Sequence, residues 1–114
     1  MLLTIVERKV MPDITVVEVS GRLALGRESQ RIETLVDELI QKNERRAVLD
    51  LTGVDYIDSA GIGMLALASG KWRKAGGALA IVAPEGRVLQ MLKLTQMSAV
   101  IKVCPTVAEA TAAV

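Results

Sequence analysis

The sequence predicts an α/β fold in which short buried strands alternate with helices. Three observations support it: a β-branched hairpin pattern at the N-terminus, short apolar runs separated by segments of helical periodicity, and Gly or Pro at most borders. The expected order is ββαβαβαβα, a mostly parallel sheet with an antiparallel N-terminal hairpin and helices packed on it. Since the 114 residues show no linker or repeat, we expect a single domain spanning 1–114.

The first two strands are predicted at residues 3–10 and 14–20, paired as a hairpin. Residues 11–13 form the turn between them, because proline lacks an N–H and aspartate favours turns. Gly21 is expected to end the second strand, and Gly26 to mark a bend.

An amphipathic helix is predicted over residues 28–43. Its apolar stripe has helical spacing and comprises Ile32, Leu35, Val36, Leu39 and Ile40. The apolar run 47–51 is broken only by Asp50 and is typical of a central parallel strand. Residues 52–57 are expected to form a loop leading to Asp58.

The rest of the chain repeats the alternation of strand and helix. A helix over 59–74 is followed by the stop Gly76-Gly77, and a strand over 78–83 is stopped by Pro84. A short helix over 86–94, a strand over 99–103 and a terminal helix over 105–113 complete the order.

Composition argues against several classes of function. The formal net charge is +1, and the basic clusters, Arg45-Arg46 and residues 71–74, are interpreted as helix ends, so no direct contact with nucleic acid is expected. The chain has no apolar run of membrane-spanning length, which predicts no membrane insertion and a cytoplasmic location. It also has no His, the commonest general base, and a lone cysteine, Cys104.

Ser59 is the most informative residue, because it falls where the predicted central strand gives way to a helix of small and aliphatic residues. Backbone N–H groups at a helix start lack partners, so Ser59 suits an N-cap. The same place suits a hydroxyl that is reversibly phosphorylated. Either Asp58 or Ser59 could provide the cap, and two successive candidates leave Ser59 available for modification.

Three other chemistries fit less well. A serine hydrolase needs a base beside the hydroxyl, and no His is present. The run Gly61-x-Gly63-x-x-Ala66 is a degenerate dinucleotide fingerprint, better explained by close backbone approach. Asp50, Asp55 and Asp58 lack the spacing of a metal loop. We therefore expect no catalytic residue, metal or cofactor, and a protein that is not an enzyme.

The chain resembles the STAS family, specifically the bacterial anti-sigma factor antagonists. The most specific part is the run 49–63, LDLTGVDYIDSAGIG, with Asp-Ser-x-Gly at its core. Supporting segments lie in the expected order at 20–23, 76–79 and 88–95. The resemblance covers nearly the whole chain.

The resemblance implies a switch. An antagonist of this family binds an anti-sigma factor, often itself a serine protein kinase, and so frees a sigma factor for transcription. The kinase phosphorylates the serine that aligns with Ser59, the complex dissociates, and a serine phosphatase restores binding. Ser59 is thus the expected phosphorylation site, on a protein expected to be a monomer or weak homodimer.

The partner-binding surface implied by the resemblance surrounds this serine. It comprises Asp55, Asp58, Ser59, Ala60, Gly61, Gly63 and Met64, although capping by Asp58 and a core position for Met64 are equally compatible with the sequence. Ala60 stands where many relatives carry Ser or Thr, so Ser59 is the only hydroxyl inside the motif. The alternative function is a STAS subunit that regulates or supports a transporter or a stress-signalling complex.

Overall fold

The computed structural model describes residues 4–11, 13–24 and 27–114. Its elements follow the predicted order, with one additional 3-10 turn. They are β1 (Thr4–Met11), β2 (Ile14–Leu23), α1 (Arg27–Gln41), β3 (Arg46–Ile57), α2 (Ser59–Lys74), β4 (Ala78–Val82), α3 (Arg87–Leu94), η1 (Met97–Ala99), β5 (Lys102–Cys104) and α4 (Val107–Ala113). The predicted bend at Gly26 and the proline of the predicted turn lie outside the described residues.

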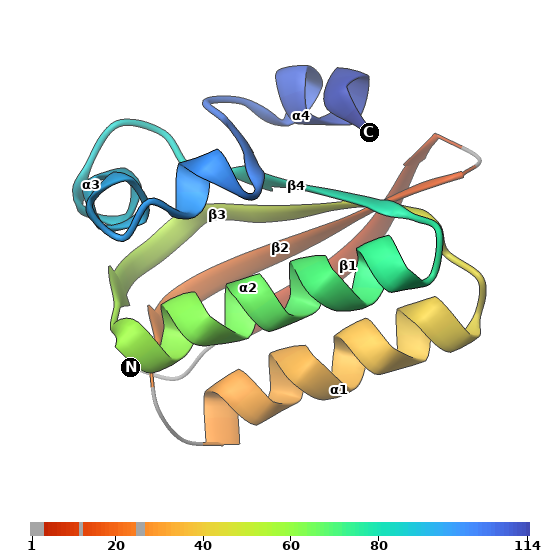
Figure 1. Ribbon diagram of the computed structural model, residues 1–114, viewed down its shortest axis with the longest axis horizontal. Helices are drawn as coiled ribbons and strands as arrows, with labels where there is room; N and C mark the ends of the chain where they lie inside the picture. The colour runs from red at the N-terminus through yellow and green to blue at the C-terminus, as the bar shows by residue number, and fades with distance from the viewer. Residues whose placement is uncertain (1–3, 12, 25–26) are drawn as a thin grey trace.

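The five strands form one mixed sheet in the order β1-β2-β3-β4-β5. β1 is antiparallel to β2, and the other neighbouring strands are parallel. Helices α1 and α2 cover one face of the sheet, α4 covers the other, and α3 lies at one end of β3 (Figure 1). The predicted fold class is therefore confirmed.

Two clusters of buried side chains fill the spaces between these layers. The larger packs alternate strand residues, such as Val17, Leu49 and Ile81, against α1, α2 and α3. The smaller packs the intervening positions, such as Val16 and Val48, against α4. Because successive side chains of a strand point to opposite faces, central strands buried on both sides read as continuous apolar runs.

The central strand is longer than predicted. Residues 52–57, expected as a loop, continue β3 and pair with the second half of β2, which runs past Gly21 to Leu23. Two register shifts and a positive φ of 100° at Gly21 accommodate this pairing. Val54 and Ile57 are buried, so residues 52–57 pack on the core.

Two further boundaries were predicted wrongly. The last strand covers only Lys102–Cys104, because Met97–Ala99 forms a 3-10 turn whose Met97 is buried with Ile101 in the larger cluster. The pair Arg45-Arg46 does not end a helix, since α1 stops at Gln41 and Arg46 begins β3. Across the described part of the chain, no helix is both long and apolar enough to cross a membrane.

Candidate functional site

The start of α2 is held by Asp58, not by Ser59. Asp58 has extended backbone angles, and its side-chain oxygen accepts a hydrogen bond of 2.9 Å from the Gly61 N–H. Its own N–H donates to the Leu23 carbonyl at 3.3 Å, which fastens the helix start to the end of β2. Of the two candidates, Asp58 is therefore the N-cap.

Ser59 is the first residue of α2, and its side chain is exposed. Within the described residues its hydroxyl makes no hydrogen bond. Since Asp58 already satisfies the Gly61 N–H, the hydroxyl is not needed to start the helix. Ser59 thus presents an accessible hydroxyl on a rigid element, at the positive end of a helix dipole.

The two glycines that follow have different surroundings. A Cβ at Gly61 would come within 2.4 Å of the Leu23 carbonyl oxygen, so this glycine lets the helix approach β2 closely. A Cβ at Gly63 would meet nothing within 4 Å, and Gly63 is exposed. Only Gly63 is therefore placed where a partner could touch it directly.

The remaining residues of the predicted surface also divide into accessible and buried ones. Asp55, near the end of β3, is exposed, and Ala60 is half-buried. Met64 is buried in the larger core cluster, between the two helices of that face. The accessible residues of the predicted surface are consequently Asp55, Asp58, Ser59, Ala60 and Gly63, while Gly61 and Met64 are buried.

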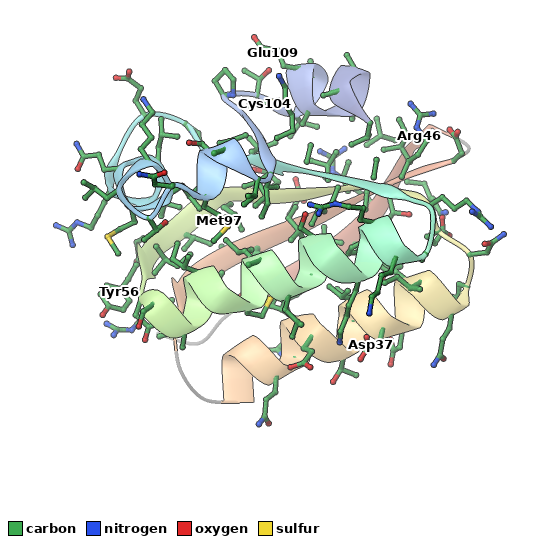
Figure 2. The ribbon with its side chains drawn as sticks, viewed as in Figure 1. Asp37, Arg46, Tyr56, Met97, Cys104 and Glu109 are labelled. Carbon is green, nitrogen blue, oxygen red and sulfur yellow. The ribbon has the colours of Figure 1, made fainter. Side chains whose placement is uncertain are left out.

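A cation at this end of the sheet was not among the predicted site residues. The Arg22 guanidinium lies 4.3 Å from the centre of the Tyr56 ring, and the two residues are register partners on β2 and β3. Tyr56 lies beside the start of α2 (Figure 2). Nothing in the residue types alone indicates this contact, because it depends on the unpredicted extension of both strands.

The other polar groups singled out by sequence have structural partners. Asp50 is buried and accepts hydrogen bonds from the Thr52 N–H at 3.0 Å and the Thr52 hydroxyl at 2.5 Å. Cys104 is buried in the smaller core cluster. The described residues contain no group of three His, Cys, Asp or Glu side chains arranged to hold a metal. Asp50 and Asp58 thus have local structural roles.

A sequence profile of the STAS domain matches residues 6–110, which is nearly the whole chain. The chain belongs to the STAS family. A half-buried Asp58 followed by an exposed Ser59 thus begins the helix after the central strand of a STAS domain, and the family expectation drawn from the run 49–63 is confirmed.

Similar proteins carry names from the same family. A Thermotoga neapolitana protein described as an anti-sigma factor antagonist homologue is 26% identical over 102 residues, 90% of each chain. The crystal structure of an anti-sigma factor antagonist from Mycobacterium paratuberculosis superposes with a TM-score of 0.87 at 24% identity, covering 98% of this chain and 93% of that one. The unphosphorylated Bacillus-type antagonist SpoIIAA gives 0.73 at 15% identity, covering 93% and 92%. The last two likenesses concern the fold.

Proposed function

We propose that this STAS domain is an anti-sigma factor antagonist whose partner binding is switched by phosphorylation of Ser59. One observation is the main support for the proposal: Asp58 caps α2, so the Ser59 hydroxyl is exposed and is not needed to hold the start of the helix. The name of the Thermotoga neapolitana relative supports the antagonist class.

The chemistry at Ser59 belongs to its partners. A serine protein kinase transfers the γ-phosphoryl group of ATP, so the Ser59 oxygen loses its proton, an O–P bond forms and ADP leaves. A serine phosphatase later hydrolyses that bond with water. The domain contributes position, since the acceptor stands on a rigid helix start and projects away from the core.

Electrostatics explain why the modification would release a partner. Phosphate adds about −1.5 to −2 charges beside the carboxylates of Asp58 and nearby Asp55. The helix N-terminus offsets part of this, about 0.3–1 kcal/mol in exposed geometry. A partner seated on Ser59 would have to desolvate the phosphate and face its charge. A penalty of about 3–4 kcal/mol weakens binding by two to three decades.

Phosphorylation of the purified domain tests the proposal. The protein is incubated with ATP and the anti-sigma type serine kinase of the same organism, and phosphate is located by mass spectrometry. We expect modification of Ser59, its loss in Ser59→Ala, and its retention in Ser98→Ala, a matched exposed serine on η1. Absence of phosphate, or phosphate that persists in Ser59→Ala, would overturn the switch.

A further inference from the structure

β1 leaves one edge of the sheet open. It stands at the end of the strand order and pairs only with β2 among the described strands. The register with β2 is regular from Thr4 to Lys9, so the outer edge of this stretch presents an uninterrupted run of backbone N–H and C=O groups. Val6 and Val10 on this strand remain 48% and 40% exposed. Such an edge is a template for another strand.

The side chains of β1 are self-complementary in one register. In an antiparallel pair, residues that lie directly opposite each other point to the same face of the sheet. When two copies of β1 are related by a two-fold axis perpendicular to the sheet, the axis must therefore pass through a residue. Centred on Arg8, the pairing sets Glu7 opposite Lys9 of the second copy, twice, and Val6 opposite the segment around Val10.

Neighbouring registers lack this match. A centre on Glu7 opposes two glutamates, and a centre on Lys9 opposes two lysines. The central register opposes two copies of Arg8, each of which is ion-paired with Glu18 of its own chain at 3.3 Å between Nε and Oε2, and this one repulsive pair is outnumbered by the two Glu7–Lys9 pairs. Charges on an edge strand normally prevent edge pairing; here their order permits it in one register.

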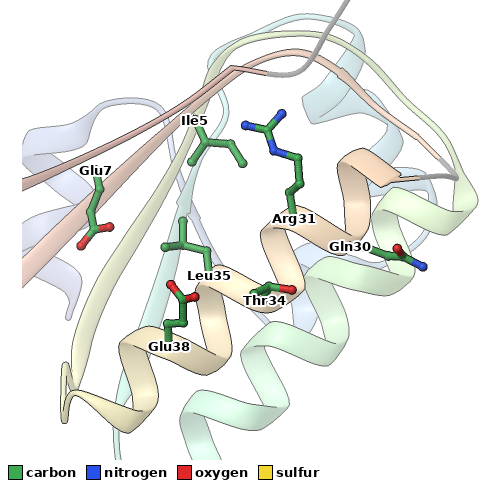
Figure 3. A pocket seen from close by; sticks show the side chains of 7 residues that line it. All are labelled: Ile5, Glu7, Gln30, Arg31, Thr34, Leu35 and Glu38. Atoms are coloured by element: carbon green, nitrogen blue, oxygen red, sulfur yellow. The ribbon is translucent and has the colours of Figure 1, made fainter.

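The space beside β1 can receive the incoming side chains. A groove of about 660 Å³ runs between β1 and α1. Ile5 and Leu35 form its apolar part, and Glu7 on the strand and Glu38 on the helix supply carboxylates (Figure 3). Neither carboxylate has an ion pair within the described residues. Arg31 also lines the groove, beside Ile5, so a lysine opposite Glu7 would enter the part that holds the two carboxylates (Figure 3).

Lys9 is held on the correct face to do so. It is ion-paired with Glu44 in its own chain, and its register partner is the buried Thr15, opposite Ala47 of the larger core cluster. Lys9 therefore lies on the face that α1 covers, as Glu7 does. Across a two-fold axis this face is shared by the two copies.

We propose that a second copy of this chain adds its β1 to the β1 edge, antiparallel and centred on Arg8, to form a continuous ten-stranded sheet. A single strand pair buries less than the ~800 Å² per partner of a stable interface, so the dimer is weak and concentration-dependent. The contact does not involve Ser59.

Charge reversal tests both the dimer and its register. Sedimentation equilibrium of the wild-type chain should show a monomer–dimer equilibrium. Glu7→Lys or Lys9→Glu alone should weaken it at least about tenfold, because symmetry repeats each repulsive contact. The double variant should recover it. An equimolar mixture of the two single variants should form heterodimers, since both of their cross-strand pairs are attractive.

Two further variants complete the design. Arg8→Thr removes the one repulsive pair and should tighten the dimer, whereas Ser59→Asp should leave it unchanged, which separates this contact from the proposed switch. Circular dichroism confirms that each variant is folded. A wild-type chain that stays monomeric at millimolar concentration overturns the proposal. If charge reversal leaves the dimerisation affinity unchanged, or if the two single variants fail to form heterodimers, the proposed register is wrong.

Discussion

Near the start of α2, Gly61 and Gly63 differ in what surrounds them, and this predicts opposite effects of the same substitution. Gly61→Ala places a methyl 2.4 Å from the Leu23 carbonyl oxygen and should destabilise the fold by about 1–3 kcal/mol. Gly63→Ala enters open space in a helix and should be neutral or stabilise by up to about 1 kcal/mol. Urea unfolding followed by the fluorescence of buried Trp72 measures both. Equal effects would contradict the packing described for Gly61.

A second residue-scale prediction separates capping from signalling. Asp58→Ala removes the acceptor of the Gly61 N–H and should cost about 0.5–2 kcal/mol of stability. Ser59→Ala should change stability by much less, since its hydroxyl has no partner among the described residues. The same unfolding assay compares them. If Ser59→Ala proved the more destabilising, Ser59 would be part of the structure and the switch would lose its basis.

The bounds of some helices and strands follow from the local sequence, whereas those of others do not. The helix over 59–74 was predicted with its observed bounds, because a capping residue, a run of small and aliphatic residues and two glycines mark it locally. The extension of β3 through residues 52–57 could not be found this way. It depends on pairing with β2 across register shifts and on burial of Val54 and Ile57, which are tertiary effects.

The candidate site shows the same division between local and tertiary information. Local residue types indicated Asp58 and Ser59 as a pair, but only the hydrogen bond to Gly61 decides which of them is the cap. Gly61 was expected beside a partner and Met64 either there or in the core, and their burial follows from packing against β2 and α1 respectively. Arg22 lies beside Tyr56 at this end of the sheet because β2 is longer than predicted.

One side chain joins elements distant in the sequence. Arg46 on β3 donates to Asp13 Oδ2 at 2.7 Å and to the Val114 carbonyl at 2.8 Å, and so links the N-terminal hairpin to the end of the chain after α4. Arg46→Met should lower the melting temperature and speed amide exchange in α4. Arg45→Met, which loses only a 3.3 Å contact to the Ala75 carbonyl, serves as the control. Equal exchange in both variants would contradict the link.

The same contact predicts a pH dependence. The hydrogen bond from Arg46 holds the pKa of Asp13 below its usual 3.8, outweighing the opposing effect of desolvation. A lowered pKa in the folded state means that the contribution is present above 3.8 and is lost as pH falls through the lower folded pKa. Arg46→Met should therefore flatten the stability profile in this acid range, measured by thermal melts. An unchanged slope would show that Asp13 contributes nothing.

For the whole molecule, we propose that charge at Ser59 changes association without changing the fold. The hydroxyl is exposed and Asp58 maintains the helix start, so the added phosphate displaces no described internal contact. Ser59→Asp should accordingly weaken partner binding while the melting temperature shifts little. A large spectral change throughout the domain, seen by NMR on phosphorylation, would contradict this.

The most direct test compares the affinities of the unmodified and the Ser59-phosphorylated domain for the anti-sigma factor by isothermal titration calorimetry. We expect tight binding of the unmodified form, a dissociation constant about 10²- to 10³-fold higher after phosphorylation, and nearly equal melting temperatures. Equal affinities of the two forms would contradict it.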